Sequence, residues 1–209
     1  QPWLETGSKL LATGLIQIFV SFKMMVGLPL HADVIGDITE LKGYGRVVRD
    51  DTFPATLDFD IESYDNVETR AGRVAITFLD ESTVKLTEHS QLLIDEYIYD
   101  PDPDKSKMAL QFASGTIRFI SGNVAKINKK NITLSTPTAD IAVRGTDFTV
   151  TVDEFGRSLI ILLPDSDGLS SGEILVSTAS GSVTLNKPYQ ATTTTVYEQS
   201  PTKPITLEI

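Results

Sequence analysis

Apolar and polar residues alternate with a two-residue period along most of the chain after Asp33. The alternation is clearest in 73–79 and 83–88, and the short polar turn 80–82 between them predicts a β-hairpin. The same pattern predicts further strands at 92–99, 109–120 (two strands broken near Ser114-Gly115), 131–135, 148–152, 158–163, 173–177 and 182–185. The run 158–163 is nearly all apolar, which predicts burial on both of its faces.

Helix signals are weak in the same region. No long stretch keeps the apolar stripe of an amphipathic helix, so the sequence predicts an all-β fold. Short strands separated by turns are typical of a short-stranded, twisted β-sandwich or a β-solenoid-like domain, which we place at residues 33–190. Residues 191–209 are rich in threonine and contain two prolines, so we expect an extended, loosely attached tail there.

The first 32 residues follow a different pattern. Leu10–Phe22 is a continuous apolar run with a lysine directly before it, and a proline and a small alanine follow before residue 33. These features are typical of a secretory signal peptide. A membrane anchor over 10–30 and a buried helix are the alternatives, although Lys23 would lie inside the membrane span. We therefore expect residues 1–32 to form a hydrophobic helix that exports or anchors the chain.

The stretch from Ser135 to Phe148 is the most informative part of the sequence. Pro137 cannot donate a hydrogen bond to a β-ladder, so it ends a first strand near the start of this stretch. Ala139, Ile141 and Val143 then alternate and share one face of a second strand. The sequence thus predicts two short strands separated by a turn.

The second part of this stretch predicts a change of direction. Gly145 permits a backbone turn that a residue with Cβ would resist. Thr146 can bond locally to the backbone, and Phe148 returns to the core. Two interpretations remain open, a tight corner between strands or a ligand site built on Arg144, Thr146 and Asp147.

This stretch resembles the signature of the FecR domain family. The matching positions are Thr136-Pro137, Ala139, Val143, Gly145-Thr146, Phe148 and Val150. Three upstream segments resemble parts of the family in the same order: the hairpin Gly72–Glu88, the strand Ser90–Ile94, and Leu110–Phe119 with Gly115 at its centre. The resemblance covers residues 66–152.

The resemblance implies an envelope β-domain without catalysis. In this family the domain lies outside the cytoplasmic membrane, and the best-known members relay an iron–siderophore signal from an outer-membrane receptor to an extracytoplasmic-function sigma factor. We therefore expect a periplasmic or secreted binding module with a protein partner in the cell envelope. The alternatives are an N-terminally truncated transmembrane anti-sigma regulator, and a virion or surface structural protein that carries the domain.

The composition argues against nucleic-acid partners and against cysteine or histidine chemistry. The formal net charge of −10 disfavours nucleic acid as a partner, because an acidic surface repels phosphates. The chain has no cysteine and only two histidines, which removes thiolate chemistry and clustered histidine ligands. We expect no cofactor, no metal, and membrane contact only through residues 1–32.

Catalytic motifs are not evident either. The sequence contains no GxSxG, HExxH, Walker or GxGxxG pattern, so we predict no catalytic residue. Asp100–Asp104 has three carboxylates at alternate positions, but Lys105 and Gln111 occupy the places where an EF-hand loop needs glycine and glutamate. We interpret this segment, and the similar 165–168, as solvated acidic turns.

Overall fold

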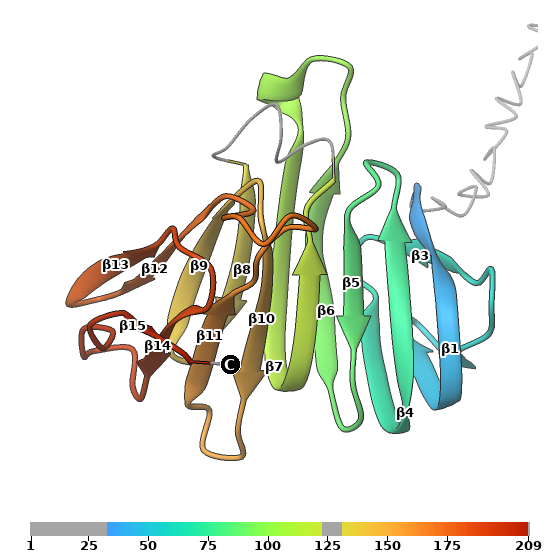
Figure 1. Ribbon diagram of the computed structural model, residues 1–209. Helices are drawn as coiled ribbons and strands as arrows, with labels where there is room; N and C mark the ends of the chain where they lie inside the picture. The colour runs from blue at the N-terminus through green and yellow to red at the C-terminus, as the bar shows by residue number, and fades with distance from the viewer. Residues whose placement is uncertain (1–32, 123–130, 209) are drawn as a thin grey trace, which may run out of the picture. The chain divides into compact units, whose positions relative to one another are not determined.

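The computed structural model describes residues 33–122 and 131–208 (Figure 1). In these residues fifteen strands form one hydrogen-bonded sheet, and the only helical segment is a short 3-10 turn, Pro103–Lys105. The predicted all-β class is confirmed. No helix within the two described ranges is long and apolar enough to span a membrane. The hydrophobic helix predicted at 1–32 lies outside the described residues.

The strands vary from two to fifteen residues in length. They are β1 (Val34–Val48), β2 (Thr52–Pro54), β3 (Asp60–Glu62), β4 (Asn66–Phe78), β5 (Thr83–Leu86), β6 (Gln91–Ile98), β7 (Lys107–Ile120), β8 (Ile132–Thr136), β9 (Ala139–Arg144), β10 (Asp147–Val152), β11 (Ser158–Leu162), β12 (Glu173–Thr178), β13 (Gly181–Leu185), β14 (Gln190–Thr194) and β15 (Ile205–Thr206).

Three long strands, β1, β4 and β7, change neighbours partway along their length. β4 pairs with β6 through residues 66–68 and with β5 through 74–77. β7 lies between β6 and β8 through its first part and between β5 and β10 through 115–120. The sheet is therefore two half-sheets joined through these strands. Half-sheet A has the order β3-β1-β4-β5-β7-β10-β11-β14-β15, and half-sheet B has the order β2-β1-β4-β6-β7-β8-β9-β12-β13.

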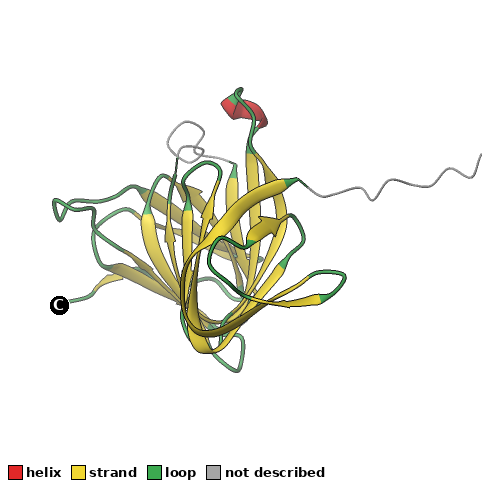
Figure 2. Ribbon diagram, turned by 90° about the vertical axis from the view of Figure 1, so that its right-hand side faces the viewer, coloured by secondary structure: helices red, strands yellow, loops and turns green. Residues whose placement is uncertain are grey.

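Both half-sheets contribute to one hydrophobic core, over which the strands curve (Figure 2). Ile76 and Phe148 of half-sheet A and Ile141 of half-sheet B are fully buried. Phe78 of β4 stacks on Tyr97 of β6, with ring centroids 5.4 Å apart. β5, β9 and β10 alternate between core and solvent, which is the arrangement that the two-residue period predicts.

The bend of β7 lies at Gly115. β7 is continuous from Lys107 to Ile120, so the break predicted near Ser114-Gly115 is a bend and not an end. Gly115 has φ +94°, and a Cβ there would lie 2.2 Å from Ser90 Oγ. The positive φ and the close approach to Ser90 each disfavour any residue with a Cβ at position 115. Ser90 Oγ also accepts the Thr116 N–H at 3.2 Å, which fixes the bend against the chain just before β6.

Two expectations about the C-terminal part are wrong. β11 is buried on one face only, since Leu159 keeps 37% of its surface exposed. The tail is also firmly attached, because β14 pairs with β11 and Thr194 is only 2% exposed. Thr138 shares hydroxyl hydrogen bonds with Ser158 at 2.9 Å and with Thr194 at 2.8 Å. This buried cluster fastens the tail to the turn between β8 and β9.

Candidate functional site

The family-like stretch forms a corner between the two half-sheets. Pro137 follows the end of β8, and the alternating apolar residues of β9 point into the core. β9 belongs to half-sheet B and β10 to half-sheet A, so the chain crosses between them at Gly145 and Thr146. Gly145 has φ +64°, a conformation that favours glycine. We call residues 145–147 the signature corner.

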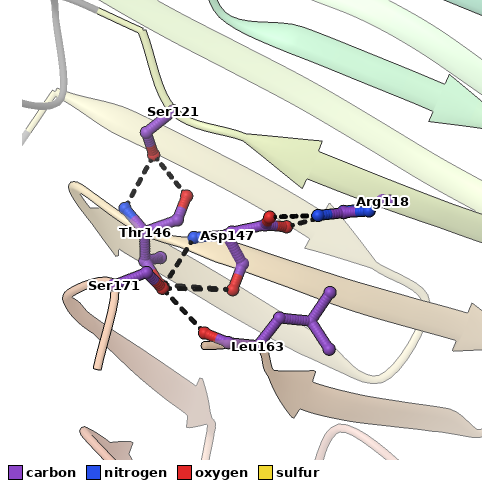
Figure 3. A network of polar contacts seen from close by, with 6 residues as sticks. All are labelled: Arg118, Ser121, Thr146, Asp147, Leu163 and Ser171. Carbon is purple, nitrogen blue, oxygen red and sulfur yellow. Dashed lines mark hydrogen bonds and ion pairs between the residues drawn. The ribbon is translucent and has the colours of Figure 1, made fainter. Parts of the chain in front are cut away.

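Two serines from distant segments hold the signature corner (Figure 3). The Thr146 N–H donates to Ser121 Oγ at 2.9 Å, and Ser121 Oγ donates to the Thr146 carbonyl at 2.7 Å. Ser171 Oγ lies 2.8 Å from Thr146 Oγ1, accepts the Asp147 N–H at 3.0 Å and donates to the Leu163 carbonyl at 2.8 Å. Thr146 is buried, so these contacts satisfy polar groups that water cannot reach.

The charged residues of the predicted ligand site do not converge. Arg144 pairs with Glu173 of β12 at 2.5 Å. Asp147 binds Arg118 of β7 through two contacts of 2.9 and 2.5 Å, which raise the pKa of the Arg118 guanidinium. Arg144 and Asp147 thus bind partners on different half-sheets. The ligand site on Arg144, Thr146 and Asp147 stays a prediction.

A groove of about 510 Å³ lies on the solvent side of half-sheet A, and Arg118 belongs to it as well. One border is a row of residues from neighbouring strands, Glu40, Lys85, Arg118 and Thr149, with Ala75 between the first two. The other border is formed by Lys42, Arg73, Thr87 and Thr116. Between the two borders lie Val74, Leu86 and Ile117, whose side chains are buried in the core, so the space above them stays open. We call this feature the outer groove.

Ion pairs hold most of the basic side chains of the outer groove. Glu40 Oε1 reaches across β4 to Lys85 Nζ at 2.7 Å, because Ala75 between them is short. Arg73 Nε binds Glu88 Oε1 at 2.9 Å. Lys42 makes no ion pair within the residues that the structure describes. Sequence reasoning missed the groove, although Lys85 and Arg118 occupy solvent-facing positions of alternating strands.

The acidic turns use their carboxylates locally. Asp100 accepts the Asp102 N–H at 2.7 Å, and Asp165 accepts the N–H groups of Asp167 and Leu169, both at 2.9 Å. Across residues 33–122 and 131–208, no group of three or more metal-ligating side chains is placed to hold an ion.

The fold and the signature corner define an all-β domain built on two half-sheets that share long, bent strands. The family model described as FecR protein matches residues 65–184, which is more than half of the chain. The chain therefore belongs to the FecR family.

Two solved structures are similar to this chain in fold. Two crystal structures of a protein from Parabacteroides distasonis ATCC 8503, described as an anti-sigma factor, match at TM-score 0.51 with 15% and 14% sequence identity. The match covers 68% of this chain but only 60% of that protein. No curated protein matches the chain in sequence. At this identity the structural likeness establishes the shared fold alone.

Proposed function

We propose that this chain is the partner-binding β-domain of a FecR-type regulator, which acts in the cell envelope by protein contact and without catalysis. The observation that carries the proposal is the FecR match, which covers most of the β-domain, residues 65–184. The anti-sigma description of the structurally similar protein supports a role in signalling. The outer groove offers exposed charged side chains on a rigid sheet, a surface suited to recognising a partner.

Export of the domain is part of the proposal. The apolar run 10–22, with basic and small residues around it, supports delivery across a membrane by a signal peptide or an anchor. Fractionation of the native host, with protease added to intact spheroplasts, tests this step. The domain should be digested from outside the cytoplasmic membrane. Full protection with the cytoplasmic fraction would overturn the proposed location.

Deletion of the gene in its native host tests the regulatory role. We expect the abundance of a small set of transcripts to change, and a plasmid copy of the wild-type gene to restore them. Phe148→Ala is the matched destabilised control, and it should restore the transcripts less well than wild type does. An unchanged transcriptome in the deletion strain would exclude regulation and leave a purely structural role.

A further inference from the structure

We propose that the outer groove binds an acidic protein segment in extended conformation. This inference rests on the proposed function, because it names the chemistry of the partner that a regulatory domain would recognise. The charges of its side chains and its shape determine which partner fits the groove.

The charge of the outer groove opposes that of the whole chain. Its lining contains four basic residues, Lys42, Arg73, Lys85 and Arg118, and one acidic residue, Glu40. When the neighbouring carboxylates of Glu88 and Asp147 are also counted, the balance is four positive against three negative, or +1, whereas the chain carries −10. A local positive surface on an otherwise acidic protein attracts negatively charged partners to that place.

The basic side chains are available to a second carboxylate. The pairs Lys85–Glu40 and Arg73–Glu88 are largely exposed to solvent. Exposed ion pairs contribute little to stability, so exchanging one carboxylate for another costs little. Lys42 has no partner to lose in the described part of the chain. Arg118 presents a planar guanidinium, which can donate to a further oxygen beside Asp147.

The shape of the outer groove fits an extended segment. It crosses β1, β4, β5, β7 and β10, and four spacings of about 4.8 Å give a length of about 19 Å, enough for about six extended residues. In an extended segment, successive side chains point to opposite sides. Acidic residues at neighbouring positions would therefore meet Lys42 and Arg73 on one border and Lys85 and Arg118 on the other.

Recognition would use side chains and not strand addition. β4, β5, β7 and β10, which lie under most of the groove, are paired on both edges there, so their backbone N–H and C=O groups are occupied. The stems of the long basic residues provide an apolar lining, which suits short aliphatic side chains of the partner.

A charge-reversal experiment on the full chain tests the inference. The probe is fluorescein-labelled octaglutamate, whose binding is followed by fluorescence anisotropy at low and at physiological salt. We expect Lys85→Glu and Lys42→Glu each to weaken binding by about tenfold or more. Lys107→Glu is the matched control, since Lys107 is also an exposed lysine paired with one glutamate, Glu96, but lies outside the groove. It should change binding by less than about twofold.

Several outcomes would overturn the inference. Equal losses in Lys85→Glu and Lys107→Glu would show general electrostatic attraction. Binding of octalysine, or of phosphatidylglycerol vesicles in place of octaglutamate, would assign the surface to another class of partner. Wild-type protein that does not bind octaglutamate would also refute it.

The transcript experiment separates this inference from the proposed function. If Lys85→Glu restores the transcripts of a deletion strain as well as wild type does, regulation stands and the groove is not the contact site. If octaglutamate binds in the groove but deletion leaves transcripts unchanged, the binding site stands and regulation fails.

Discussion

The signature corner and the outer groove both involve Arg118, yet they use polar groups in opposite ways. At the corner, Thr146 is only 3% exposed, and its backbone and hydroxyl groups are bonded to Ser121 and Ser171. In the groove, the charged side chains remain open to solvent, and Arg73 keeps 61% of its side chain exposed. Removing a partner from a buried polar group costs much more than removing one from an exposed pair.

This difference separates the residues that identify the family from those that can recognise a partner. The corner residues determine how the chain crosses from half-sheet B to half-sheet A. The groove residues determine only what the outer face presents, because the strands below them are already packed. Substitutions should therefore affect stability at the corner and binding at the groove.

Phe148→Ala should have the largest effect on stability. Phe148 directly follows the signature corner, is fully buried and packs on Phe119 with ring centroids 5.5 Å apart. Loss of a buried phenylalanine ring costs roughly 3–5 kcal/mol. Urea denaturation measures the change, with Leu159→Ala on the half-exposed face of β11 as the control. A midpoint close to that of wild type would show that the ring contributes little to the core.

Ser171→Ala should destabilise the corner to a smaller degree. The change removes the acceptor of the Asp147 N–H and the partner of the Thr146 hydroxyl. Unsatisfied polar groups of this kind cost about 1–3 kcal/mol. Ser170→Ala, an exposed neighbour, should change stability by less than about 0.5 kcal/mol. Equal effects of the two variants in urea denaturation would mean that the corner does not depend on Ser171.

The sequence predicted the middle of the fold well because alternation is a local property. Strands such as β5 and β10 keep a regular two-residue period, and their apolar residues are buried. β1 was not predicted, since register shifts between Ile38 and Glu40 and between Gly43 and Gly45 change which residues face the core. The pattern of β1 is therefore irregular although the strand is the longest in the described residues.

The candidate site could be predicted only in part because it depends on contacts between distant residues. The turn at Gly145 could be inferred from the residue type alone, but the two serines that hold it lie about 25 positions away on either side. Arg144 and Asp147 are close in sequence but are separated by the crossing. Glu40 and Lys85 are 45 positions apart and meet only because β4 lies between their strands.

The Arg118–Asp147 pair should show a modest coupling, because it joins the corner to the groove. The side chain of Asp147 is 14% exposed and that of Arg118 is 48% exposed. The pair is therefore intermediate in exposure between the buried contacts of the corner and the exposed ion pairs of the groove. A double-mutant cycle with Arg118→Gln and Asp147→Asn should give a coupling of about 0.2–1 kcal/mol that falls at high salt. A coupling above about 3 kcal/mol would place the pair with the buried contacts of the corner.

Lys42→Ala should have the smallest effect on folding. Lys42 is exposed and makes no ion pair in the described part of the chain, so its removal leaves no buried group without a partner. Surface changes of this kind alter stability by less than about 0.5 kcal/mol. Urea denaturation should therefore give nearly the same midpoint for Lys42→Ala and wild type, while octaglutamate binding weakens. A loss of stability as large as that of Ser171→Ala would mean that the groove, like the corner, is needed for the fold, and the division between the two regions would fail.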